Sequence, residues 1–325
     1  MPPISRRRFV HHFAAGTAGA AVAGFVPRAL AAAPLGMPIG SQTYPHRSMV
    51  MEGNFAGLCK MMADIGVGSL ELCSPGYKEF ASLKDAKPVK TILDDHGLTS
   101  PSAHFTLNSL RKEQPAMIDW AKTIGMTQMV VASLGGGGRG ATVTMDQVKS
   151  AADEYNRIAE GAAKAGLQQA LHNEGFEASM VEGRRVYDLL FELLDPKLVK
   201  FQFQMSSTRT LGIDPVAFFR QHTGRFISLH LQGVPAAAPQ PPAAPAPPAP
   251  STTSTPPTPP AAPAAGVGQR GRGRGRGPAL PVGGDSLNWA EVFRAARDGG
   301  IRNYFVEQNW DLTQKSVASL RTLTV

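Results

Sequence analysis

Polar side chains that can bind a ligand or exchange a proton recur at regular places in this 325-residue chain. Each adjoins a short apolar run: His172 follows Leu171, His230 lies between two leucines, and Glu307 follows Val306. The same arrangement gives further candidates, which are Gln42, Tyr44, Glu71, His104, Glu174, Gln202 and Gln204. Side chains of a β-strand alternate between its two faces, so each polar residue lies opposite its bulky apolar neighbours. If the strands lie side by side, these residues predict a ligand site.

The elements that must position them are short strands alternating with amphipathic helices. The predicted strands are 38–44, 68–73, 100–106, 127–132, 167–173, 199–205, 226–231 and 302–307. The predicted helices are 54–65, 87–96, 108–124, 144–165, 184–194, 214–222, 287–299 and 312–323. Glycines follow several helices, as helix-ending residues do, and Asp214 and Asp285 supply helix starts. Eight such repeats predict one (β/α)8 barrel.

The polar residues lie near the C-terminal ends of these strands, where barrels of this kind carry their ligand sites. A barrel interior that serves packing alone prefers Val, Ile and Leu. Any single candidate could be a buried polar group satisfied by its neighbours. The set as a whole favours a ligand site, because seven of the eight predicted strands contribute to it.

A low-complexity tract interrupts the barrel after the seventh strand, at 234–284. It consists almost wholly of Pro, Ala, Ser, Thr, Gly and Arg, so it has too little apolar surface to offset the entropy of ordering. We expect a disordered insertion there. Its Arg-Gly repeat at 270–276 could bind RNA or an anionic surface, but a solvated loop is the favoured interpretation. Without this tract and residues 1–33, about 240 residues remain, close to the roughly 250 typical of the fold.

The N-terminus has the pattern of an export signal. Arg6, Arg7 and Arg8 precede an Ala/Gly-rich apolar stretch from Phe13 to Val26 and a small-residue motif at 29–31. This order predicts a twin-arginine signal peptide over 1–33 and a periplasmic mature protein, 34–325. The stretch is too short and too weakly apolar for a stable membrane anchor. Cys59 and Cys73 could form a disulfide in that compartment, although Cys59 fits a buried free thiol better.

The net charge of +8 does not indicate a nucleic-acid partner. Four arginines lie in 1–33 and four in 234–284, and neither segment contains an acidic residue. Those eight residues account for the whole excess, so the globular part is balanced in charge. A neutral body argues against nucleic-acid binding, and a small molecule is the expected partner.

Several segments together resemble a known family. His172-Asn173-Glu174-Gly175-Phe176-Glu177 is similar to the His-Asn-His-x-Phe-Glu motif of the sugar phosphate isomerase/epimerase family, within the xylose isomerase-like barrels. Other segments are similar to the family's pattern in the same order along the chain: Ser102-Ala103-His104, 195–199, 214–216, Leu229-His230-Leu231, 282–289 and 304–308. The match covers essentially the whole mature chain outside the insertion.

This resemblance implies a divalent metal, Mn, Mg, Zn or Co, held at the mouth by residues of strands five to eight. Carried over by position, the ligands would be Glu174, Gln204, His230 and Glu307, with His172 as an alternative to Glu174. Such a metal polarises a sugar carbonyl, and a nearby base abstracts the adjacent proton. The resemblance therefore implies isomerisation, epimerisation or β-elimination of a sugar or keto-sugar. Glu307, Glu174 and His172 would be catalytic, and His104, Glu71, Gln42, Tyr44 and Gln202 would contact the substrate.

Two departures from the family pattern weaken the metal set. Gln204 stands where the family usually has an acid, and Gln232-Gly233 replaces its Lys-Asp. Glu174, in place of the second His of the motif, could restore the lost negative charge. The alternative hypothesis is therefore a sugar-binding or scaffold protein that kept the barrel and lost catalysis.

Two further features allow a functional and a structural interpretation. The run Gly135–Gly138 with Arg139 could cradle a phosphate, but a flexible loop is favoured. Tyr44 and Trp310 could stack on a sugar ring or could serve packing.

Overall fold

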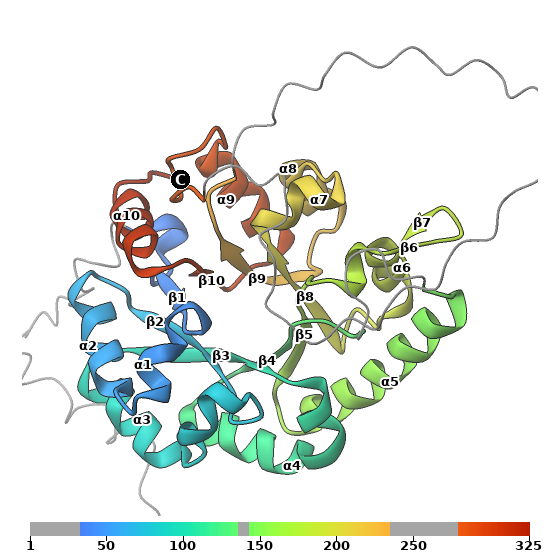
Figure 1. The fold of residues 1–325 in the computed structure, drawn as a ribbon. Helices are drawn as coiled ribbons and strands as arrows, with labels where there is room; N and C mark the ends of the chain where they lie inside the picture. Colours follow the sequence, from blue (N-terminus) through green and yellow to red (C-terminus); the bar gives the residue numbers. More distant parts are fainter. Residues whose placement is uncertain (1–32, 136–142, 235–278) are drawn as a thin grey trace, which may run out of the picture.

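A closed barrel of eight parallel strands forms the centre of the protein (Figure 1). The computed structural model describes residues 33–135, 143–234 and 279–325. Around the barrel the order is β1-β10-β9-β8-β5-β4-β3-β2. The strands are β1 (Gly40–Gln42), β2 (Ser69–Cys73), β3 (Thr99–Phe105), β4 (Gln128–Val131), β5 (Gln168–Leu171), β8 (Val199–Gln204), β9 (Phe226–Leu231) and β10 (Asn303–Val306). The predicted (β/α)8 barrel is confirmed, and each strand falls within one predicted range except β3, which begins one residue earlier, at Thr99.

Helices surround the barrel on its outside (Figure 1). The longer ones are α2 (Phe55–Asp64), α3 (Ala86–Asp95), α4 (Leu107–Ile124), α5 (Met145–Lys164), α6 (Val186–Leu193), α8 (Pro215–Gln221), α9 (Trp289–Gly299) and α10 (Trp310–Leu320). Short helices α1 (Arg47–Met51) and α7 (Thr208–Leu211) and a hairpin of β6 (Met180–Val181) and β7 (Arg184–Arg185) occupy the loops that follow β1, β8 and β5. The predicted helices match the longer set, whereas these short loop elements were not predicted.

Side-chain caps fix where the helices begin. Thr144 accepts a hydrogen bond from the Gln147 N–H at 3.2 Å, and the Gln147 side chain accepts one from the Thr144 N–H, which forms a capping box. Asp214 caps α8 as predicted, but α9 is capped by Asn288. Asp285 instead accepts hydrogen bonds from the Val234 N–H and the Trp289 indole. It therefore ties the loop before α9 to the end of β9.

Alternation sorts the strand residues as expected. Phe201 and Phe203 of β8 point outward, where they pack with Tyr187 of α6 and Phe218 of α8. Gln202 and Gln204 take the opposite, interior face. The outward aromatic layer buries apolar surface, which stabilises the contact between sheet and helices.

One strand departs from simple alternation. Ile227 was expected among the outward apolar residues of β9, but it packs with Val130 and Ala170 inside the barrel. The pairing of β8 with β9 shifts there, from Phe201↔Phe226 to Gln202↔Ser228. This bulge leaves Ile227 without a partner position, and it turns the side chain to the interior face.

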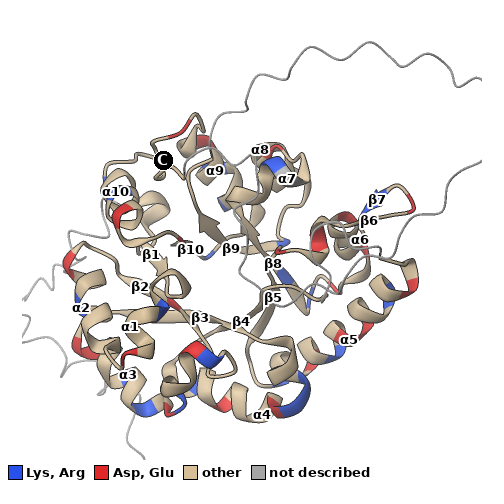
Figure 2. Ribbon diagram, in the orientation of Figure 1, with Lys and Arg blue, Asp and Glu red and all other residues tan. Residues whose placement is uncertain are grey.

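Most of the predicted signal peptide, 1–32, and most of the predicted insertion, 235–278 between β9 and α9, lie outside the described residues. Gly233 and Leu280, on either side of the second segment, form an antiparallel bridge. Within the described part of the chain, no helix has the length and hydropathy needed to cross a bilayer. Charged residues of both signs are spread over outer helices such as α4 and α5 (Figure 2).

Candidate functional site

Three histidines from separate strands meet inside the mouth of the barrel. His104 belongs to β3, His172 follows β5, and His230 belongs to β9. Their ring centroids lie 4.5 to 5.2 Å apart, and the rings of His104 and His230 are stacked. One ring nitrogen of each lies within 4.8 Å of the others, and all three side chains are buried. The convergence expected from strand alternation is therefore present.

A fully buried carboxylate, Glu71 of β2, lies beside this cluster. Its Oε2 accepts a hydrogen bond from Nε2 of His230 and lies 3.3 Å from Nε2 of His104. Its Oε1 accepts hydrogen bonds from Oγ of Ser102 and Nε2 of Gln202, each at 2.7 Å. The carboxylate is thus saturated by protein donors.

Glu307 forms the second acidic position, just beyond the end of β10. Its Oε2 accepts hydrogen bonds from Nε2 of Gln204 at 2.5 Å and Nε2 of Gln232 at 3.1 Å. The same oxygen lies 3.4 Å from Nδ1 of His230. His230 therefore stands between two carboxylates, one at each ring nitrogen.

Glu71, Glu307 and His230 each stabilise the charged form of their neighbours. Burial alone would raise the pKa of Glu71, but the neighbouring charges of His104 and His230 and its hydrogen bonds lower it to about 2. Burial would likewise raise the pKa of Glu307, and the charge of His230 lowers it to about 2. Burial opposes the charge on His230, yet the two carboxylates raise its pKa to about 10.

His172 has the opposite electrostatic environment. Its burial, and then the charges of His230 and His104, lower its pKa well below the usual value. The ring is therefore neutral at ordinary pH, with one nitrogen lone pair available.

Several buried polar atoms of the described site have no hydrogen-bond partner. They are both ring nitrogens of His172, Nδ1 of His230, Oε1 of Gln204 and Nδ2 of Asn173. One ring nitrogen of His172 and Oε1 of Gln204 can donate lone pairs to a divalent ion, and Nδ1 of His230 can do so when the metal displaces its proton. Two ligands about 2.1 Å from one tetrahedral ion lie about 3.4 Å apart, as Nδ1 of His230 and Oε2 of Glu307 do. The donor set fits a metal.

Other predicted site residues lie around this centre. Gln42 donates to Sγ of Cys73 at 3.5 Å and accepts from the Tyr44 N–H. The Tyr44 ring packs against Tyr77 and Phe80. Glu174 lies past the end of β5 and is exposed, so it belongs to the rim of the mouth and not to the buried cluster. Gly136–Gly138 and Arg139 lie outside the described residues.

The structure adds residues that were not among the predicted site residues. Ser102 and Ser228 both join the Glu71–Gln202 network, and each lies two positions before a site histidine on the same strand. This two-residue spacing puts each serine on the same strand face as the histidine, and it could have identified both serines from the sequence. Asn173 accepts from the Gln204 N–H at 2.8 Å. Glu177, the last residue of the motif, is buried and accepts from Ser133 and from the Leu134 N–H. It joins the loops after β4 and β5.

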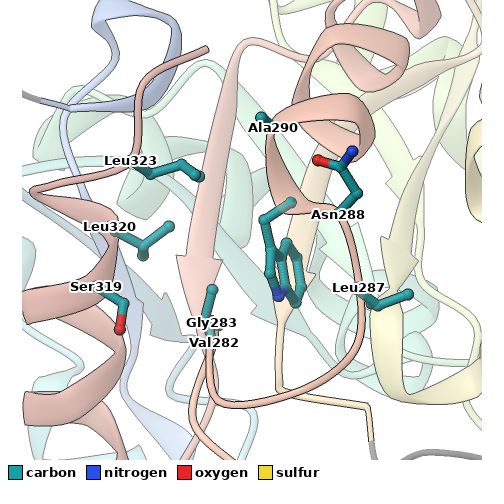
Figure 3. A pocket seen from close by; sticks show the side chains of 9 residues that line it. Val282, Gly283, Leu287, Asn288, Ala290, Ser319, Leu320 and Leu323 are labelled. Atoms are coloured by element: carbon teal, nitrogen blue, oxygen red, sulfur yellow. The ribbon is translucent and has the colours of Figure 1, made fainter.

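A separate apolar cavity of about 260 Å³ lies between the loop before α9 and the end of α10 (Figure 3). Val282, Leu287, Leu320 and Leu323 are among its lining residues. None of its lining residues is titratable, so this cavity lacks the means for acid–base or metal chemistry. The two free thiols, Cys59 and Cys73, are buried and unpaired.

Solved structures with a similar fold include sugar phosphate isomerase/epimerase and xylose isomerase-like barrel proteins. A sugar phosphate isomerase/epimerase from Parabacteroides distasonis has a TM-score of 0.61 at 20% identity, covering 87% of this chain and 93% of its own. A xylose isomerase-like TIM barrel protein from Mycobacterium smegmatis in complex with magnesium has a TM-score of 0.59 at 13% identity, covering 88% and 95%. An IOLI protein with a bound zinc atom has a TM-score of 0.56 at 12% identity, covering 88% and 94%.

No protein-family model and no curated protein matches the sequence. The resemblance indicated by the motif after β5 is confirmed at the level of fold: the structural neighbours are sugar phosphate isomerase/epimerase and xylose isomerase-like barrels. The similarity in sequence is too low to carry a specific activity across.

Proposed function

We propose that this protein is a metal-assisted enzyme that moves a proton next to the carbonyl of a sugar or keto-sugar. Isomerisation, epimerisation and β-elimination share that step. The observation that carries the proposal is the group of unpartnered donor atoms of His172, His230 and Gln204 beside the ionised carboxylate of Glu307. The sugar-processing structural neighbours support the substrate class.

His172, His230, Gln204 and Glu307 would hold the ion, with Glu174 of the rim as an outer candidate. The two imidazole donors suit Zn or Co better than Mg, whereas the oxygens of Gln204 and Glu307 suit Mn or Mg. When bound, the ion polarises the substrate carbonyl and acidifies the neighbouring C–H group.

The chain's own residues supply the proton acceptor. Glu307 is ionised at neutral pH, and Gln204 and Gln232 fix its orientation through Oε2. Its Oε1 receives neither of these hydrogen bonds, so this oxygen can accept a proton from carbon. Glu174, exposed at the rim, is a second acid or base that can return a proton to the substrate.

The metal content of the purified protein tests the proposal. We expect about one ion per chain after loading with Zn, Co or Mn, and its loss in His230→Ala. Glu307→Gln should lower kcat on free or 3-keto sugars by about 100-fold or more while the fold persists. Glu160→Gln, at an exposed position of α5, serves as a control. Absence of metal after loading, with sugar binding retained, would support the binding-protein alternative.

We also propose that the enzyme acts in the periplasm after twin-arginine export. The basis is the N-terminal pattern of arginines, apolar stretch and small residues. Cell fractionation of the wild type and of an Arg6→Lys, Arg7→Lys variant checks this. Retention of only the variant in the cytoplasm is the expected result, and cytoplasmic wild-type protein would contradict it.

A further inference from the structure

The most constrained group in the site is Glu71. Its side chain has no exposed surface. Four donors surround it: Ser102 and Gln202 at Oε1, and Nε2 of His230 and His104 at Oε2. These residues come from β3, β8 and β9, so one carboxylate on β2 contacts three other strands.

The orientation of the Gln202 amide follows from this arrangement. A carboxylate oxygen only accepts hydrogen bonds, so the amide nitrogen must face Oε1 of Glu71. The same nitrogen donates to Oγ of Ser228 at 2.7 Å. The amide oxygen therefore faces Nε2 of His104, at 2.8 Å.

The position of one proton on each ring follows in turn. Nε2 of His104 faces two acceptors, the Gln202 oxygen and Oε2 of Glu71. Nε2 of His230 faces the same Glu71 oxygen. Since neither acceptor can donate, each Nε2 must carry a hydrogen, so Nδ1 is the ring nitrogen that can offer a lone pair, in His230 after a metal has displaced its proton.

We propose that Glu71 is a positioning residue that holds the Nε2–H of both His104 and His230, so that Nδ1 of His230 is the atom presented to a metal. Histidines that bind metals commonly hold the other ring N–H on a carboxylate, which orients the ring. Here one carboxylate does so for two rings at once, and Nδ1 of His230 faces Glu307. The role at the metal rests on the proposed function, but the positions of the protons do not.

Nitrogen NMR of the ¹⁵N-histidine-labelled, metal-free protein reads the proton positions directly. We expect a protonated Nε2 in both His104 and His230, with His104→Gln and His230→Gln samples used for assignment. A bare Nε2 in either ring would overturn the proposal. This measurement needs no substituted Glu71, so it decides the matter even if Glu71→Gln fails to fold.

Zinc titration supplies the second readout. Glu71→Gln should bind zinc about 10- to 100-fold more weakly than the wild type. Ser102→Ala removes a donor to the other Glu71 oxygen and leaves the imidazole contacts, so its affinity should stay within about threefold. Equal affinities of Glu71→Gln and the wild type would count against positioning. If the wild type bound no zinc, the proposed metal assistance would fail, whereas the NMR result would still support or overturn the proton assignment.

Discussion

Oε2 of Glu71 accepts a hydrogen bond from Nε2 of His230 although 159 residues separate them along the chain. Their strands, β2 and β9, are not neighbours, because β1 and β10 lie between them in the barrel. The contact therefore crosses the interior of the barrel. It ties early and late strands together with a buried ion pair, whose removal from one side leaves an uncompensated charge.

The stability of the metal-free protein should depend on pH through this pair. The pKa of His230 is raised to about 10, so its contribution is complete below pH 6.5 and is lost as pH rises toward 10. The pKa of Glu71 is lowered to about 2, so its contribution is complete above pH 4.5 and is lost as pH falls toward 2. Melting temperatures from pH 2 to 10 in a chelator should fall at both extremes. Glu71→Gln should reduce the fall above pH 8, and an unchanged profile in that variant would contradict this assignment.

Glu177 should add a separate slope at intermediate pH. Burial raises its pKa to about 8, against the hydrogen bonds from the Leu134 N–H and Ser133 that lower it. The folded protein thus retains a proton that the unfolded chain releases, so the free energy of unfolding falls between pH 4.5 and about 8 and is level above. Glu177→Gln imitates the neutral form and should remove this slope. The exposed Glu160→Gln on α5 should leave it, and equal slopes in both variants would disprove the expectation.

Strand alternation was sufficient to predict the barrel and most of its interior. It placed His104, Gln202 and His230 on one face because each lies within a regular strand. It failed at Ile227, where a bulge between β8 and β9 changes the face without any signal in the residue types. The sequence of one strand shows the alternation of its side chains, but it does not show how that strand pairs with its neighbour.

The same limit explains Glu174 and Glu71. Glu174 shares the parity of His172, but β5 ends at Leu171, so alternation no longer governs its direction and the side chain lies at the rim. Glu71 was expected to contact a substrate. Its saturation by Ser102, Gln202 and His230 depends on how four strands meet across the barrel, which a single sequence does not reveal.

Removal of 235–277 should leave the barrel intact. Gly233 N–H donates to the Leu280 carbonyl at 3.1 Å, so the two ends of the insertion are already held together, and a few glycines suffice to close the turn. A shorter loop costs less closure entropy, so the melting temperature should equal or slightly exceed that of the full chain.

Gly233→Ala is the matched control for this deletion. Its Cβ would lie 2.4 Å from the Pro281 carbonyl, and it should lower the melting temperature by disrupting the bridge. A deletion that destabilises as much as Gly233→Ala would contradict the expectation.

Gln204→Glu should lower the stability of the metal-free protein and raise its affinity for metal. Gln204 donates to Oε2 of Glu307 at 2.5 Å, and a second carboxylate there would replace that hydrogen bond with repulsion. The metal-free variant should therefore melt at a lower temperature than the wild type.

The same substitution should raise the affinity for metal. Since Oε1 of Gln204 is buried and unpartnered, the added charge would also face the donor atoms of the site. Affinity for Mn and Mg, which prefer anionic oxygen, should rise about tenfold. Gln232→Glu meets the same Glu307 oxygen from a half-buried position and should gain less. Equal gains in the two variants would show that net charge alone acts, and no gain in Gln204→Glu would remove Gln204 from the metal site.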